Sequence, residues 1–170
     1  MTDALVTPAL LPLVYEPLPL GTVKPTGWLR RQLEIQRDGL SGHLAEFWPD
    51  VAQSAWIGGD AAGWERGPYW LDGAIPLAVL LDDEPLLGRV RFWVDEILAR
   101  QHANGWFGTE ADPRISGTGT VNLSHPYDPW PRFVLLKALT QWQEATGDDR
   151  IIPAIEIGRA SCRERVLVTV

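Results

Sequence analysis

The chain has 170 residues and a formal net charge of −7, with 45% hydrophobic and 22% charged residues. This composition is sufficient for a buried core and excludes a compositionally disordered chain. Because there is no basic surplus to neutralise phosphates, we expect neither a nucleic-acid partner nor a membrane partner. The chain contains nine Trp, against three Tyr and four Phe. Flat indole rings stack on sugar faces but also fill protein cores, so the composition leaves both roles open.

Residues 1–24 are predicted to form an extended strap over the surface of the domain that follows. Four prolines interrupt the apolar stretch of this segment, and proline favours extended backbone. Its first twenty residues contain no Lys or Arg, which argues against a secretory signal or a membrane span. We therefore expect a cytoplasmic protein.

Helical periodicity dominates the rest of the chain, and strand signals are weak. Trp28, Leu29 and Leu33 form the apolar side of a first predicted helix, and Trp28 is expected to pack in the core. The helix over 69–81 is apolar nearly all round and is therefore expected to be buried. The predicted elements in chain order are a helix over 25–40, a loop over 43–64, helices over 69–81 and 84–101, a long loop over 102–128, a helix over 129–146 and a short helix from Arg150.

Two acidic pairs, Asp82-Asp83 and Asp148-Asp149, each follow one predicted helix and precede the next. Acidic residues at such positions cap the start of the second helix, and the two helices then form a hairpin. Consecutive helix hairpins build bundles, α-solenoids or closed toroids. The sequence therefore predicts an all-α fold.

Aromatic and carboxylate residues gather in or beside the loops between these helices, over residues 46–50, 64–73, 104–108 and 125–132. Loops at one end of a helical array can converge on a cleft, where indoles offer stacking surfaces and carboxylates accept hydroxyl protons. Glu65 has the alternative of an ion pair with Arg66 or Arg132. Asp72, inside an apolar helix, must be paired, capped or functional. Trp93 and Trp142 lie at helical spacing and are expected in the core.

The last fourteen residues, 157–170, differ in kind from the rest and carry three Arg. The run IGRASCRERV, residues 157–166, resembles the translation of a common short-read sequencing adapter, and the alternative is a natural basic helix end. On the adapter interpretation, the genuine protein sequence continues differently after Glu156. The chain's single cysteine, Cys162, lies in this tail, so no internal disulfide or cysteine-based zinc site is expected.

Four runs of the sequence resemble the N-terminal part of the β-L-arabinofuranosidases of glycoside hydrolase family 127. These runs are PTGWLRRQLEIQRDGLSGHLAEFWPD (25–50), GWERGPYWLDGAIPLAVLLDD (63–83), NGWFG (104–108) and YDPWPRFVLLKALTQWQEATGDDR (127–150). The resemblance covers about residues 20–156. It implies that residues 25–156 are part of an (α/α)6 toroid, a six-hairpin glycosidase catalytic domain.

The family is known for a zinc-bound cysteine nucleophile and a glutamate acid/base in the later part of this domain, and no position here matches them. The resemblance therefore implies no catalytic residue and no metal ligand in this chain, with zinc expected only in the full-length enzyme. What the chain would supply is part of the substrate-facing wall. The candidate sugar-binding residues are Trp64, Glu65, Tyr69, Trp70, Asp72, His125, Asp128 and Trp130.

The sequence thus favours a truncated glycoside hydrolase whose full-length form hydrolyses terminal glycosidic bonds, with the fragment inactive by itself. One alternative is a non-catalytic α-helical carbohydrate-binding or scaffold module, and another is a helical-repeat interaction protein without a sugar ligand. An incomplete toroid leaves apolar surface uncovered. We therefore expect the isolated chain to self-associate or to be poorly soluble.

Overall fold

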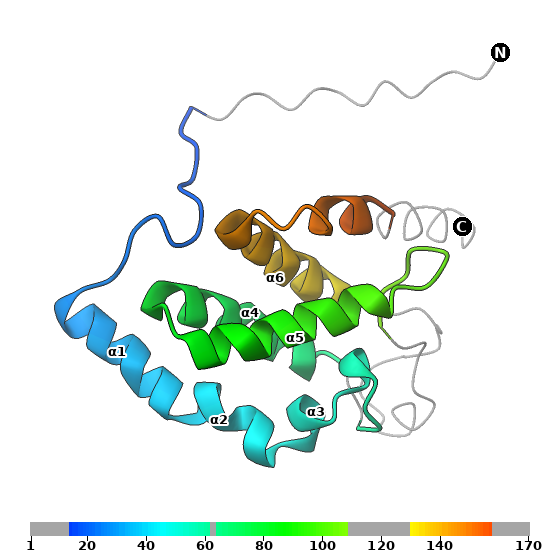
Figure 1. The fold of residues 1–170 in the computed structure, drawn as a ribbon, viewed down its shortest axis with the longest axis horizontal. Coiled ribbons are helices and arrows are strands. Elements are labelled where there is room, and N and C mark those ends of the chain that lie inside the picture. The colour runs from blue at the N-terminus through cyan, green and yellow to red at the C-terminus, as the bar shows by residue number, and fades with distance from the viewer. Residues whose placement is uncertain (1–13, 62–63, 109–129, 158–170) are drawn as a thin grey trace.

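The computed structural model describes residues 14–61, 64–108 and 130–157 (Figure 1). Within these ranges the chain is helical and contains no β-strand, apart from an isolated bridge between Ser54 and Ala61. The all-α prediction is confirmed. The elements are α1 (Gly27–Asp38), α2 (Leu40–Phe47), α3 (Pro49–Ala52), the 3-10 turn η1 (Ala55–Ile57), α4 (Arg66–Leu81), α5 (Glu84–Ala99), α6 (Trp130–Thr146) and a final helical segment over 151–157.

The predicted loop over 43–64 is wrong, because much of this region is helical as α2, α3 and η1. Gly39 interrupts the helix after α1 as expected, but the chain resumes helical geometry at the next residue. Pro49 then occupies the first turn of α3, and the Ser54 side chain accepts from the backbone N–H of Trp56 at the start of η1. Proline at the first turn and a serine cap are helix-starting signals, so this segment is a chain of short helices.

Helix α4 is the centre of the molecule, and α1, α2, α3, α5 and α6 all pack against it. Nine of its sixteen residues are buried, as its apolar composition predicts. Asp82 ends α4 in the left-handed conformation, with φ of 54°. Asp83 then caps α5 by accepting the backbone N–H of Leu86 at 2.9 Å. The first acidic pair therefore separates two helices of a hairpin, as predicted.

The second hairpin has the same construction. Gly147, with φ of 71°, follows α6, and the Asp148 carboxylate accepts the backbone N–H of Arg150 at 3.1 Å before the helix over 151–157. The Asp148 carboxylate also accepts the indole N–H of Trp142 at 3.2 Å. These contacts fix the turn between the two helices.

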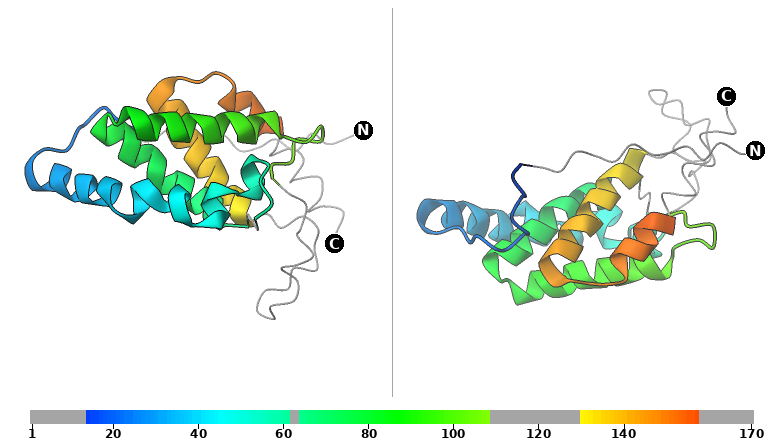
Figure 2. Two further views of the ribbon diagram at one scale, coloured as in Figure 1. Left: turned by 60° about the horizontal axis from the view of Figure 1, so that its bottom comes forward. Right: turned by 90° about the horizontal axis from the view of Figure 1, so that it is seen from above.

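The two hairpins lie side by side with like-directed helices adjacent (Figures 1 and 2). Helices α4 and α6 run in the same direction and pack extensively, and α5 runs back along α4. The segment over 151–157 runs back along α6, and two hydrogen bonds join this part of the chain to α5 and to the residues just after α5. Arg150 donates to Asp95 at 2.8 Å, and the Gln101 amide donates to the Ala154 carbonyl at 2.9 Å. The starts of α4 and α6 consequently lie at one end of the array.

The core contains Trp93 and Trp142, each 3% exposed, as predicted. Trp28 was expected to pack in the core, and that prediction is wrong because its side chain is 73% exposed. Helix α1 contains no buried residue. Its apolar side is present, but among the described residues only α2 and α4 pack extensively against this helix.

The described part of the strap, residues 14–24, contains no helix or strand. Leu20 packs against the core, and the Lys24 ammonium donates to the Asp82 carboxylate at 2.7 Å and to the Val79 carbonyl. A cation at the carboxyl end of α4 is favoured by the helix dipole. Residues 1–13 and 158–170 lie outside the described part, and with them most of the predicted non-native tail. In the described residues, none of the helices is both long and apolar enough to span a lipid bilayer.

Candidate functional site

Two cross-helix contacts place several of the predicted site residues on one face of the molecule. The indole Nε1 of Trp130 donates to Glu65 Oε2 at 2.7 Å. One heptad further along both helices, the Lys137 ammonium donates to both carboxylate oxygens of Asp72, at 2.7 and 2.9 Å. Both contacts join residues 65 positions apart in sequence, as expected for parallel helices in a fixed register. We call this face, with its residues Glu65, Tyr69, Asp72, Trp130, Phe133 and Lys137, the α4–α6 ladder.

The first contact holds a large aromatic ring at the surface. Trp130 is 51% exposed at the first position of α6, and Glu65 is half-buried at the N-cap of α4. A hydrogen bond to a carboxylate is about twice as strong as one between neutral groups. The indole is therefore oriented by Glu65 and still offers much of its surface to solvent. Glu65 forms this contact instead of an ion pair with Arg66 or Arg132, because Arg66 bonds Asp50 and Arg132 points to the core.

Asp72 was expected to be paired, capped or functional, and the structure shows that it is paired. Its side chain is 21% exposed, against 63% for Lys137. The partner arrives from the neighbouring helix, so the ion pair also joins α4 to α6. Asp72 and Lys137 leave a polar edge on the ladder, with ammonium and carboxylate atoms both in reach of solvent.

Tyr69 lies between these two contacts on α4, four residues after Glu65 and three before Asp72. Its ring is 48% exposed. Phe133 has the corresponding place on α6, three residues after Trp130 and four before Lys137, and is 65% exposed. Side chains three and four apart share one face of a helix. The ladder therefore presents an aromatic centre between two polar contacts.

Trp64 lies just before the ladder and is half-buried. Its carbonyl accepts the indole N–H of Trp56 at 2.7 Å. This contact ties the loop before α4 to η1. Trp64 is thus close in sequence to Glu65, and its backbone takes part in the packing at the start of α4.

A buried arginine organises the core beneath this end of the array. The Arg132 guanidinium lies 5.3 Å from the ring centre of Trp56 and 4.2 Å from that of Trp106, and it donates to the Phe107 carbonyl at 2.9 Å. The two indoles are 2% and 3% exposed, and Arg132 is 6% exposed. Trp106 lies in the segment over 104–108, where indoles were expected to offer stacking surfaces, and Trp56 contacts the same guanidinium. Their rings are instead enclosed with a cation, where cation–π attraction is strongest.

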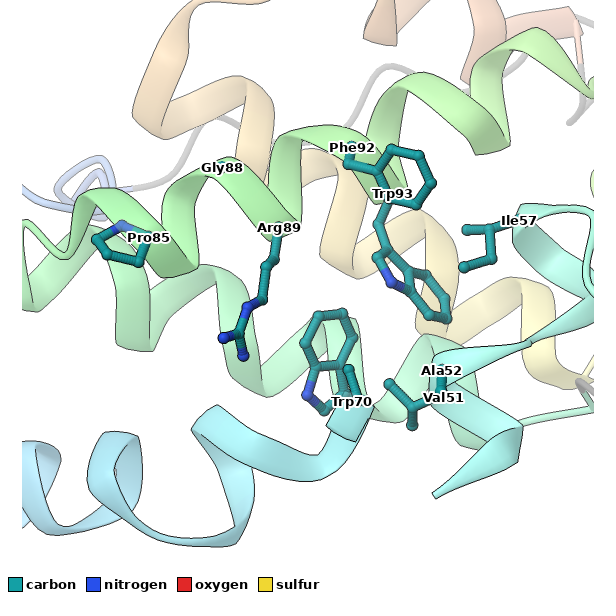
Figure 3. Close-up of a pocket in the computed structure, with 10 residues that line it drawn as sticks. Val51, Ala52, Ile57, Trp70, Pro85, Gly88, Arg89, Phe92 and Trp93 are labelled. Atoms are coloured by element: carbon teal, nitrogen blue, oxygen red, sulfur yellow. The ribbon is translucent and has the colours of Figure 1, made fainter. Parts of the chain in front are cut away.

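Trp70 is not on the ladder, although it was predicted in the same site. Its ring is 7% exposed, its Nε1 donates to the Ser41 carbonyl at 3.1 Å, and it lies 5.1 Å from the ring of Trp93. It lines a separate apolar groove of about 400 Å³ between α5 and the α2–α3–η1 segment (Figure 3). Trp70 follows Tyr69 by about 100° around the helix, so the two side chains lie on different faces of α4.

Arg89 crosses the same groove from α5. It donates to the Gly42 carbonyl, and its guanidinium lies 3.4 Å from Glu46 Oε1. These contacts hold α2 against α5. The described lining of the groove is otherwise apolar, made of Ala45, Val51, Ala52, Ile57, Pro85, Gly88, Phe92, Trp93 and Trp70.

His125 and Asp128, the other two predicted site residues, lie outside the described residues. Within the described ranges no group of three His, Cys, Asp or Glu side chains is placed to hold a metal ion. The residues that the structure describes therefore do not fit a zinc site.

Sequence reasoning missed three residues of this region. Phe133 and Lys137 had received no role in the site, and Arg132 had been considered only as an ion-pair partner of Glu65. The sequence signal that could have indicated the two contacts was spacing, since Glu65 and Asp72 are seven residues apart and so are Trp130 and Lys137. No family model, curated protein or solved structure matches this chain.

Proposed function

We propose that this chain is the N-terminal part of a glycoside hydrolase of the family 127, β-L-arabinofuranosidase type, and that it forms part of the wall of a carbohydrate site. The observation that carries the proposal is the contact between Glu65 and Trp130. It fixes a half-exposed indole beside a carboxylate, at the aligned starts of two parallel helices. Both residues lie in runs that resemble the family.

The arrangement of the hairpins supports the architectural half of the proposal, a partial (α/α)6 toroid. In such a toroid the first helices of successive hairpins are parallel neighbours, and the second helices form an outer layer. The adjacency of α4 with α6, and of α5 with the segment over 151–157, agrees with this pattern. The ladder would then face the interior of the ring, where the sugar binds.

The role of the chain in the reaction is binding and orientation. In the full-length enzyme, the expected reaction is hydrolysis of a terminal glycosidic bond through a covalent intermediate. The catalytic groups would come from the later part of the domain. Here, the face of Trp130 would stack on a sugar ring, and the Glu65 carboxylate would accept a hydroxyl proton. The fragment by itself is expected to be inactive.

The sequence of the natural gene after the Glu156 codon distinguishes this proposal from its main alternative, a non-catalytic carbohydrate-binding or scaffold module. We expect the intact reading frame to continue into a segment with clustered Cys and Glu residues. The full-length product should hydrolyse an aryl β-L-arabinofuranoside, and residues 1–156 alone should not. A natural frame that ends without that cluster would favour the binding module.

Sugar binding by the chain itself can be measured by saturation-transfer NMR with neutral methyl pentosides. We expect binding that is lost in Trp130→Ala and retained in Trp28→Ala, which removes an even more exposed indole from α1. Equal loss in both variants would show non-specific stacking. Absence of binding in the unaltered chain, with Trp emission indifferent to sugars, would favour a helical-repeat interaction protein.

A further inference from the structure

We infer that Tyr69 and Phe133 form the floor of a sugar subsite that selects neutral over acidic sugars. This inference rests on the proposed function and adds to it a residue, Phe133, and a substrate class. Its basis is the order of side chains along the α4–α6 ladder. Polar contacts stand at both ends, between Glu65 and Trp130 and between Asp72 and Lys137, and the two exposed rings lie between them.

Both rings lie on the exposed sides of their helices. Phe133 is 65% exposed and Tyr69 is 48% exposed, whereas Leu71 and Leu135 on the same two helices are fully buried. The Phe133 ring has no hydrogen-bonding group, the Tyr69 ring carries one only at its hydroxyl, and apolar ring surface left in water loses the favourable free energy of burial. Two such rings held between charged groups give a surface that is apolar at its centre and polar at its edges.

A sugar ring has the complementary distribution. Its C–H groups form an apolar face, and its hydroxyls lie around the perimeter. Placed on the two rings, it would direct hydroxyls toward the Glu65 carboxylate at one end and toward the Asp72 and Lys137 groups at the other. Ligand sites commonly combine an apolar floor with a few placed polar groups.

The space beside the rings is open. Gly73 lies one turn after Tyr69 on the same stripe of α4, and a Cβ atom at this position would meet no atom of the described residues within 4 Å. The absence of a side chain there leaves room for a ligand to extend along α4 past Asp72.

The charges of the ladder determine which sugar it accepts. Glu65 and Asp72 carry two negative charges, and the single positive charge, on Lys137, is already bonded to both oxygens of Asp72. A uronate would bring a third carboxylate to this surface, where like charges repel. A neutral pentose or hexose meets no such repulsion.

Phe133→Ala and Gly73→Leu test the subsite in two ways, by removing a contact and by adding an obstruction. The first removes half of the floor, and the second fills the open space. We expect Phe133→Ala to raise the dissociation constant for a neutral methyl glycoside about three- to tenfold, as for loss of one aromatic contact. Gly73→Leu should raise this dissociation constant by about tenfold or more, because the leucine side chain would clash with the sugar.

Gly88→Leu is the matched control, because Gly88 is also a helical glycine with open space at its Cβ position but lies on α5. Circular dichroism and a thermal melt establish that each variant is folded. The dissociation constants of methyl glucuronide and methyl galacturonide should be about tenfold higher than those of the neutral glycosides.

Two results would overturn the subsite and leave the proposed function intact. One is sugar binding that depends on Trp130 but is unchanged in Phe133→Ala and Gly73→Leu. The other is preferential binding of uronates. If the unaltered chain binds no member of either sugar class, the subsite and the proposed function both fail.

Discussion

Glu65 and Trp130 meet across 65 residues of sequence, with the indole Nε1 donating to the carboxylate at 2.7 Å. Asp72 and Lys137 repeat that separation seven residues later. Seven residues are nearly two turns of an α-helix, so both contacts lie on the same side of each helix. Together they define a parallel register between α4 and α6, and this register is what brings Tyr69 and Phe133 to the same level.

Double-mutant cycles test this register directly. For Glu65→Gln combined with Trp130→Phe we expect a coupling free energy of about 0.5–1.5 kcal/mol, because a hydrogen bond to a charged acceptor is removed. For Asp72→Asn with Lys137→Met we expect about 0.2–1 kcal/mol, since Lys137 is largely exposed. Urea unfolding of each set gives the values. Glu65→Gln with Lys137→Met is the control, and coupling there as large as in the paired sets would contradict the register.

Arg132 is predicted to be the most important charged residue for stability. Arg132→Met removes a buried hydrogen bond to the Phe107 carbonyl and two cation–π contacts, so we expect a loss of about 2–4 kcal/mol in the free energy of unfolding. Arg66→Met is the matched control. Arg66 lies 5.6 Å from the ring of Trp48 and pairs with Asp50, but it is exposed, and we expect a loss below about 1 kcal/mol. Similar losses in both variants would show that burial of the Arg132 contacts is not what stabilises this end of the fold.

The main helices follow from the sequence because their signals are local. The apolar run of α4 and the cap at Asp83 predict where one helix ends and the next begins. The short helices over 40–57 were missed because three to eight residues contain too few turns for a period to be visible. An apolar stripe also predicts which side of a helix is apolar, but it does not predict which element packs against that side. This is why Trp28 was wrongly expected in the core.

The candidate site was predictable in part. Glu65, Tyr69, Asp72 and Trp130 were selected by residue type and by their position in or beside a loop, and the structure brings these four to one face. Their pairing was not predictable, because a contact between residues 65 apart depends on how two helices pack. Trp70 was predicted in the same site only because it is adjacent in sequence to Tyr69. A helix turns adjacent side chains to different faces.

Two helical glycines should be replaceable with a gain in stability. Within the part of the chain that the structure describes, no atom lies within 4 Å of a Cβ built at Gly73 or Gly88, and neither residue has positive φ. Alanine at each should therefore stabilise the fold by about 0.5–1 kcal/mol through its higher helix propensity. Gly67 is the contrasting position, because its Cβ would lie 2.9 Å from the ring of Trp93. Thermal melts should rank Gly67→Ala below the wild type and the other two above it, and a stabilised Gly67→Ala would contradict the close packing of α4 on α5.

Stability should fall at low pH in part through Asp148. The hydrogen bond from Arg150, aided by the indole N–H of Trp142, lowers the pKa of Asp148 from 3.8 to about 2. Because the pKa is lowered in the folded state, this carboxylate stabilises the fold above pH 3.8 and loses that effect as the pH falls toward 2. We expect Asp148→Asn to cost about 1–2 kcal/mol at pH 7 and progressively less below pH 4. Urea unfolding from pH 7 to pH 2 measures this difference, with Asp149→Asn as the neighbouring control. A cost for Asp148→Asn that stays constant over that range would show that the ion pair is not its source.

The exposed apolar side of α1 should cause the isolated chain to associate. Trp28 is 73% exposed, Leu29 50% and Ile35 48%, and soluble monomers rarely leave such contiguous apolar surface uncovered. We expect the unaltered chain to sediment as oligomers whose proportion rises with concentration. Trp28→Gln combined with Ile35→Gln should shift it toward monomer with little change in its free energy of unfolding, since neither side chain is buried. Phe92→Gln is the control, because Phe92 has a similar exposure of 51% but lies on α5. A monomer with a sharp cooperative melt at all concentrations would show instead that α1 needs no covering partner, and would weaken the interpretation of this chain as part of a larger helical ring.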